Sequence, residues 1–147
     1  MKKLLSLFVI FGLSLAAPAG DRIADAAELP EAATKYIAQH FPNETIRRVT
    51  VDDDDNRNHD SKYEVVLGNR VELEFNPKGV WLEVDGGAVS IPESVLPAPV
   101  LEYLKKNYPD QPATKISVER RGYEVKLQNR LELKFNKNGR FLRIDRD

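Results

Sequence analysis

An acidic run in the first half of the chain carries the side chains that could bind a metal ion. Oxygen-bearing side chains stand at every second position of this run, at Asp52, Asp54, Asn56, Asn58 and Asp60. Carboxylate and amide oxygens at this spacing open calcium-binding loops. Further along, Arg57 stands where an EF-hand needs glycine and Tyr63 where it needs glutamate. The residues therefore leave two alternatives, a weak calcium site and a solvated acidic loop.

Residues that could carry out catalysis are few. The chain has no cysteine, which excludes thiol nucleophiles and thiolate metal sites. Its two histidines are His40 and His59, and the motifs HExxH, GxSxG and a glycine-rich phosphate loop do not occur. Ser90 and Ser94 lie in a proline-rich connector with no base nearby in the sequence. We therefore expect no enzymatic activity and no cofactor beyond a weakly bound calcium ion.

The sequence is internally duplicated. Residues 63–85 align with residues 123–145, and 13 of the 23 positions are identical. The match extends upstream, where residues 29–42 align with residues 96–109. Such a repeat predicts two similar structural units, which we call the first half (residues 28–87) and the second half (residues 88–147). The acidic run lies in a loop that is seven residues longer in the first half than in the second.

Each half is expected to contain one helix followed by four strands. Pro30 and Pro97 suit the first turns of the helices, and the aromatic-proline pairs Phe41-Pro42 and Tyr108-Pro109 end them. Apolar residues then recur at every second position in stretches separated by turn residues, with glycine where a positive φ is needed. We predict an α+β fold of two tandem repeats, each with one helix packed on a four-stranded antiparallel meander sheet.

The alternation also predicts strand register and the side chains that face away from the helix. A three-residue loop at 68–70, with asparagine or glycine in the left-handed conformation, pairs Val65 with Leu73. In the next hairpin, Phe75 is expected to pair with Val80. This register places side chains in outward rows at Glu64, Glu74 and Trp81, at Glu72 and Glu83, and, in the second half, at Phe141.

The predicted outward faces of the two halves differ in charge. The first half places glutamates opposite glutamates, which is destabilising, whereas the second half alternates acidic and basic residues. Carboxylates around an exposed Trp81 are typical of a surface that recognises a cationic protein or peptide. The alternatives are neutralisation by solvent or Arg48, and packing of the two sheets against each other, which suits Phe141. Because Trp81 is expected to be exposed, its replacement should leave the melting temperature nearly unchanged.

The first 19 residues have the features of a secretory signal peptide. A positively charged start precedes an apolar stretch at 4–16, and cleavage can follow Ala19 or Ala26. The stretch is short for a membrane span, so we expect export to the periplasm and no membrane anchor after cleavage. The net charge is −6 in the first half and +4 in the second. Neither half shows a basic face large enough for nucleic acid.

A helix that ends in an aromatic-proline pair, a four-stranded pattern and the motif NRxELxFNxxGxxLxxD occur twice behind the signal peptide. In these features, residues 29–147 resemble the PepSY-like family of secreted bacterial proteins, which are labelled beta-lactamase-inhibitor-like. The resemblance implies tandem helix-plus-sheet units, a periplasmic location and no known enzymatic activity. We expect a non-catalytic binding or inhibitor-like module that recognises a protein or peptide through an exposed sheet face. A calcium-responsive structural or regulatory protein that uses residues 52–60 is the alternative.

Overall fold

The computed structural model describes residues 20–54 and 60–145. The predicted signal peptide lies outside the described residues. Two elements precede the first half or overlap its start, β1 (Asp21–Ala24) and the 3-10 helix η1 (Ala26–Glu28). Those of the first half are then α1 (Glu31–His40), β2 (Ile46–Asp52), β3 (Tyr63–Leu67), β4 (Glu72–Phe75) and β5 (Trp81–Asp85). Those of the second half are the 3-10 helix η2 (Glu93–Val95), α2 (Ala98–Asn107), β6 (Ala113–Glu119), β7 (Gly122–Leu127), β8 (Glu132–Asn136) and β9 (Phe141–Asp145).

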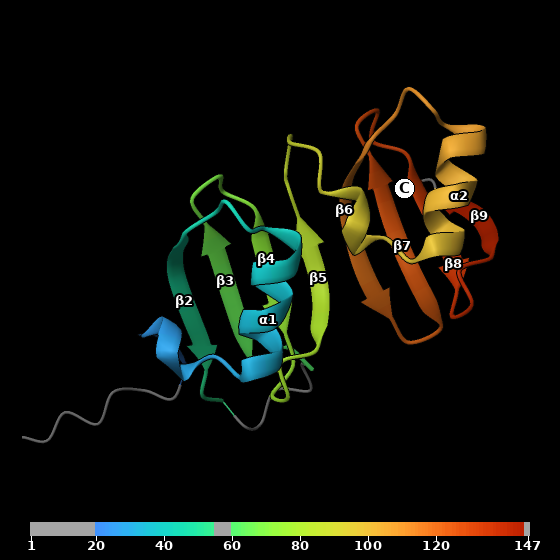
Figure 1. Cartoon of the computed structure of the whole chain (residues 1–147). Helices are drawn as coiled ribbons and strands as arrows, with labels where there is room; N and C mark the ends of the chain where they lie inside the picture. The colour runs from blue at the N-terminus through green and yellow to red at the C-terminus, as the bar shows by residue number, and fades with distance from the viewer. Residues whose placement is uncertain (1–19, 55–59, 146–147) are drawn as a thin grey trace, which may run out of the picture.

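The nine strands form one antiparallel sheet in which neighbours in the sequence are neighbours in space. Helix α1 lies over the strands of the first half and α2 over those of the second (Figure 1). The α+β class is therefore confirmed. The sheets of the two halves are continuous, because β5 pairs with β6. An additional strand, β1, pairs with the outer edge of β2 and was not predicted.

The helices begin and end where the sequence predicts. Pro30 and Pro97 occupy the N-cap positions, and Phe41 and Tyr108 the C-cap positions. Apolar side chains from the helices and from one face of the sheet form a single core. Full burial of one such side chain stabilises the fold by about 1.5–3 kcal/mol. The largest fully buried ones include Phe75, Phe135, Leu67, Leu73, Ile116, Leu127 and Leu133.

The β3–β4 and β7–β8 hairpins have the three-residue loops that the pattern predicts. The left-handed residues are Arg70 and Arg130, both at φ 69°, so the prediction of asparagine or glycine at this position is wrong. Asn69 has another role, because its side-chain oxygen accepts a hydrogen bond from the backbone N–H of Val71 at 3.0 Å. The asparagine therefore closes the loop through its side chain and leaves the left-handed conformation to the arginine.

The hairpin between β4 and β5 does not have the predicted register. Phe75 lies opposite Trp81 instead of Val80, and Glu74 lies opposite Glu83. One extra residue therefore stands in β5 and forms a β-bulge. A prediction from strict alternation cannot contain such a residue, because alternation assigns successive side chains to opposite faces.

The bulge exchanges the environments of two side chains. Trp81 packs against the core on the helix side of the sheet, whereas Val80 is 52% exposed. The hairpin between β8 and β9 has the same irregularity. Adjacent apolar pairs, Trp81-Leu82 and Phe141-Leu142, interrupt the alternation at this point in both halves. These pairs are the sequence feature that indicates the bulge.

The contacts that join the two halves include strand pairing, ring stacking and a hydrogen bond between helical segments. β5 and β6 pair over three residues, with Val84 opposite Ile116 at the centre. The Trp81 ring stacks on the Tyr123 ring with a centroid distance of 6.3 Å. The third contact is a hydrogen bond between α1 and the segment that precedes α2. The sheet face on the helix side is therefore packed without interruption across the joint.

Candidate functional site

The sheet face that points away from the helices carries a row of acidic side chains in the first half. Strand pairing places Glu64 opposite Glu74, and Glu74 opposite Glu83. Val65, which follows Glu64 in β3, is fully buried on the helix side, so Glu64 points to the opposite face. We call Glu64, Glu74 and Glu83 the acidic row. The sequence-derived register had placed Trp81 at the third position of this row, where the structure has Glu83.

Glu72 lies in the neighbouring row of the same face. It stands opposite Val66 on one side and Asp85 on the other. Arg48 precedes Val66 in this row, since the two residues lie opposite each other in β2 and β3. Glu72 and Glu83 were predicted to share one row, and the bulge places them in different rows. Four of the predicted partner-binding residues nevertheless lie on one face.

The two ends of the acidic row are paired with basic side chains. Arg48 Nη2 lies 3.3 Å from Glu64 Oε1, as the alternative of neutralisation by this arginine anticipated. Lys115 Nζ, from β6 of the second half, lies 2.8 Å from Glu83 Oε1. For Glu74, at the centre, the described residues provide no basic partner within ion-pair distance. The unbalanced negative charge of the row is therefore centred on Glu74.

Glu74 also has a perturbed acidity. Partial removal from water raises the pKa of its carboxyl group, and the carboxylates of Glu83 and Glu64 raise that pKa further. A hydrogen bond from Ser61 and the positive charge of Lys115 act in the opposite direction and are outweighed. A cation placed beside such a carboxyl group, whose pKa is raised, would stabilise its ionised form.

Replacement of Glu74 by glutamine is expected to stabilise the protein at neutral pH. The raised pKa means that the folded state keeps a proton on Glu74 at pH values where the unfolded chain has lost it, so this group makes stability fall as the pH rises above its ordinary value of 4.5. We expect Glu74→Gln to increase the free energy of unfolding by about 0.5–1 kcal/mol at pH 7 and by less at pH 4. Urea denaturation at both pH values measures this difference. Glu102→Gln, on the exposed side of α2, is the control, and an equal gain at pH 4 would contradict the assignment.

The second half carries a lysine at the position that corresponds to Glu74. Lys134 lies opposite Glu124, as predicted, and its ammonium group contacts that carboxylate. It also lies 3.0 Å from Glu119 Oε1 and 3.7 Å from Asp145 Oδ2. The same sheet position is therefore electrostatically balanced in the second half and unbalanced in the first.

The two aromatic residues that we predicted on the outward surface lie on the helix side. Trp81 stacks on Tyr36 of α1 with a centroid distance of 6.1 Å. Phe141 stacks on Tyr103 of α2 at 4.6 Å. Their predicted exposure beside the glutamates is wrong, because the bulges in β5 and β9 turn them toward the helices. Packing between the halves, which we considered for Phe141, is instead observed for Trp81 and Tyr123.

A hollow of about 200 Å³ opens beside the acidic row. Its charged lining residues are Asp21, Asp52, Lys62, Glu64 and Glu74. One water molecule has a share of about 30 Å³ in the liquid, so the hollow has room for one ammonium or guanidinium group with some of its water. The carboxylates that surround it exceed the positive charge of Lys62.

The predicted calcium ligands are described in part: Asp52, Asp54 and Asp60 are described, whereas Asn56 and Asn58 lie outside the described residues. Asp52 Oδ1 accepts a hydrogen bond from the backbone N–H of Asp54 at 2.9 Å. The carboxylate of Asp53 is paired with Arg22 at 2.6 Å. Across residues 20–54 and 60–145, no three histidine, aspartate or glutamate side chains are grouped as a metal site would need.

One histidine and one serine that are far apart in the sequence meet in the structure. His40 Nδ1 lies 2.8 Å from Ser94 Oγ, although the sequence indicated no base near this serine. Loss of water contact lowers the pKa of His40. A serine–histidine pair is part of a catalytic triad, but in the described part of the chain no carboxylate is hydrogen-bonded to this imidazole. The contact connects α1 to the segment before α2.

The fold and the duplicated pattern agree with the family comparison. The sequence matches the family described as "Putative beta-lactamase-inhibitor-like, PepSY-like" over residues 21–59 and 61–143. The chain therefore belongs to the PepSY-like family, as its resemblance predicted. No curated protein matches it.

Three solved structures from Bacteroides are similar along nearly their whole length. One, a "putative calcium-regulated periplasmic protein" of Bacteroides thetaiotaomicron, is 35% identical with a TM-score of 0.77, and the match covers 86% of this chain and 97% of that one. A periplasmic protein of the DUF2874 family from Bacteroides vulgatus is 32% identical with a TM-score of 0.77, over 88% and 100% of the two chains. A periplasmic protein of unknown function from the same organism is 35% identical with a TM-score of 0.77, over 86% and 100%.

The comparison structures also bear on cellular location. All three are described as periplasmic proteins. Within residues 20–54 and 60–145, no helix combines the length and apolar character that a membrane span requires. The predicted periplasmic location is therefore confirmed.

Proposed function

We propose that the protein is a non-catalytic periplasmic module that binds a cationic segment of another protein or peptide through the outer sheet face of its first half. The observation that carries this proposal is the position of Glu74 between Glu64 and Glu83 without a basic partner among the described residues. Like charges directly opposite each other destabilise a sheet. A bound ammonium or guanidinium group would remove this repulsion, so part of the binding energy comes from relief of strain within the row.

The second half indicates the contact that a ligand would make. Lys134 occupies the position of Glu74 and binds the carboxylates of Glu124 on β7 and Glu119 on β6. A lysine or arginine of the partner, placed in the hollow beside Glu74, would take the same role in the first half. Electrostatic complementarity of this kind favours fast and selective association over very high affinity.

The proposed surface differs from the one predicted from the sequence. It consists of Glu64, Glu72, Glu74 and Glu83, which share one face of the sheet. Trp81 holds β5 against α1 from the opposite face and does not itself contact the ligand. Phe141 belongs to the second half and lies under α2, so we leave it out of the surface.

A charge-reversal variant tests the proposal. Glu74→Lys copies the second half, so we expect it to bring a positive charge between Glu64 and Glu83 and to raise the melting temperature. The same variant should weaken binding of a fluorescein-labelled peptide of alternating lysine and serine by at least about tenfold, which corresponds to loss of one well-placed charged contact. Fluorescence anisotropy measures the affinity, and the affinity of the unaltered protein should fall as salt is added.

Glu102→Lys is the matched control, because it makes the same charge change on the exposed side of α2. This control should bind the lysine peptide nearly as well as the unaltered protein. Equal weakening by both variants would show that binding follows net charge only. Unchanged binding in Glu74→Lys would exclude the acidic row as the site.

Calcium response is a second candidate function. It is favoured by the similar protein from Bacteroides thetaiotaomicron, which is described as calcium-regulated. In this chain the ligands would come from Asp52, Asp54 and Asp60 together with Asn56 and Asn58. Calorimetric titration with millimolar calcium chloride tests it. Absence of both heat and a shift in melting temperature would exclude the site, and Asp52→Asn should remove any signal that is observed.

A further inference from the structure

The outer edge of β2 is covered along only part of its length. β1 pairs with β2 from Asp21 opposite Asp52 to Ala24 opposite Val49. Residues 46–48, at the other end of β2, have no partner strand on that side in the described part of the chain. A free strand edge presents backbone donors and acceptors to which an extended peptide can add.

The corresponding edge in the second half is occupied. By the alignment of the two halves, residues 46–48 correspond to residues 113–115. The backbone N–H groups of Gly86 and Ile91 donate hydrogen bonds to carbonyl oxygens of that stretch at 2.8 and 3.0 Å. The carboxylate of Asp85 forms an ion pair with the lysine of the same stretch at 3.3 Å. In the second half, residues 85–91 are therefore bound along the strand edge that is uncovered at residues 46–48 of the first half.

Three arginines line a common surface that begins at β2 and extends across β3. Arg47 and Arg48 are adjacent, at an irregularity in the pairing of β2 with β3. Arg70 comes from the β3–β4 loop, where it holds the left-handed conformation. Arg48 is bonded to Glu64. For Arg47 and Arg70, the described residues provide no ion-pair partner, so two guanidinium groups are available to an anionic ligand.

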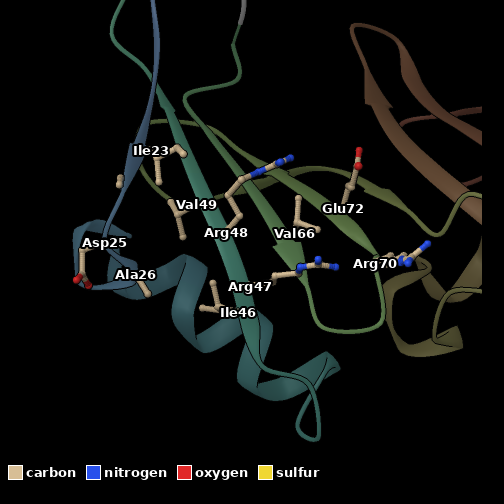
Figure 2. Close-up of a pocket in the computed structure, with 11 residues that line it drawn as sticks. Ile23, Asp25, Ala26, Ile46, Arg47, Arg48, Val49, Val66, Arg70 and Glu72 are labelled. Carbon is tan, nitrogen blue, oxygen red and sulfur yellow. The ribbon is translucent and has the colours of Figure 1, made fainter.

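These arginines border a groove of about 800 Å³ on the sheet face opposite α1 (Figure 2). We call it the arginine groove. Ile23, which is 78% exposed, and Val66 provide apolar surface in it. Its acidic lining residues are Asp25 and Glu72, at the two sides of the groove in Figure 2. Guanidinium groups beside apolar side chains suit a ligand that combines a carboxylate with apolar groups.

We propose that the arginine groove binds an extended acidic peptide segment, which adds to the free edge of β2 as residues 85–91 add to β6. Arg47, at the position that Thr114 holds in the second half, receives the carboxylate together with Arg70. Ile23 and Val66 receive an apolar side chain. The site takes a ligand of opposite charge to that of the acidic row, and it does not rest on the proposed function.

The chain itself supplies the probe. A peptide with the sequence of residues 83–91, EVDGGAVSI, is blocked at both ends, labelled with fluorescein and titrated with the full-length mature protein. We expect saturable binding that weakens at least about tenfold in Arg47→Glu, as expected for loss of a charge-assisted hydrogen bond and introduction of a like charge. A peptide with asparagine in place of its aspartate should also bind more weakly. Amide resonances of residues 46–48 should shift on binding.

Arg140→Glu provides the matched control, since it makes the same charge change in the exposed β8–β9 turn. Arg140→Glu should leave the affinity for the EVDGGAVSI peptide unchanged. Arg47→Glu should still bind the lysine peptide that tests the acidic row. Arg70→Asn, which tolerates the left-handed conformation, is a second test if Arg47→Glu lowers the melting temperature. Absence of binding at millimolar peptide, equal affinity in Arg47→Glu, or shifts confined to β9 would overturn the proposal. Displacement of the peptide by millimolar acetate would also overturn it, because that would indicate a simple anion site.

Discussion

Replacement of Trp81 by alanine is expected to lower the free energy of unfolding by about 2–3 kcal/mol. Deletion of a large aromatic side chain from a core typically costs about 3–5 kcal/mol, and the partial exposure of Trp81 places it below that range. The loss has two sources, because the indole ring stacks on Tyr36 of α1 and on Tyr123 of the second half. Denaturation in urea, followed by circular dichroism, measures the change.

Val80→Ala is the control, because Val80 precedes Trp81 in the chain and is 52% exposed. It should cost less than about 0.5 kcal/mol, as most surface substitutions do. The register expected from strict alternation predicts the opposite ranking, since it places Val80 in the core and Trp81 at the surface. A larger loss for Val80→Ala than for Trp81→Ala would therefore contradict the bulge in β5.

Gly122→Ala is expected to destabilise the protein by about 4 kcal/mol, the range reserved for substitutions that force the backbone to move. A Cβ atom at this position would lie 1.9 Å from the carbonyl oxygen of Phe135 and 2.6 Å from the carbonyl carbon of Asn136. Neither atom can move without breaking the pairing of β7 with β8. The φ angle of 153° adds strain for any L-residue. The melting temperature, measured by calorimetry, should fall accordingly.

Gly87→Ala isolates the conformational part of this effect. Gly87 has φ 62°, but a Cβ atom there would meet no atom within 4 Å. The expected loss is only about 1 kcal/mol, the usual cost of the left-handed conformation for alanine. Similar losses in the two variants would show that the contact with Phe135 does not determine the requirement for glycine.

The repeat explains why this requirement exists in only one half. β6 and β7 are joined by a tight turn, with Glu119 opposite Gly122. The residue that corresponds to Gly122 in the first half is Lys62, which follows the seven-residue insertion. The longer connection removes the need for a close backbone approach, so a lysine is accommodated.

Helix positions and the β3–β4 and β7–β8 hairpins follow from local patterns. Proline and aromatic-proline pairs determine the helix ends, and alternation determines the β3–β4 register. These features depend on residues close together in the sequence, which is why the sequence predicts them. Because the sequence is duplicated, the same helix ends and the same strand pattern occur in both halves, and each half supports the assignment made in the other.

Other features depend on contacts that no local pattern contains. Four residues at 21–24 form β1 because β2 offers an edge to pair with, and nothing in their composition predicts a strand. The adjacent apolar residues Trp81 and Leu82 indicate the bulge in β5, but the stacking of Trp81 on Tyr36 of α1 joins residues that are distant in the sequence. Lys115 neutralises Glu83 only because β5 and β6 pair across the two halves. For the acidic row, the sequence therefore predicted the glutamates, and only the pairing of strands showed that Glu74 is its unbalanced centre.

The joint between β5 and β6 also determines how the molecule unfolds. Repeat proteins behave as one-dimensional arrays in which each unit is coupled to its neighbour. Separation of the halves would expose Val84 and Ile116, which are fully buried, at a cost of about 3–6 kcal/mol. That coupling is comparable to the whole stability of a small domain. A state with one half folded and the other unfolded is therefore poorly populated. A destabilising substitution in either half lowers the free energy of unfolding of the whole molecule.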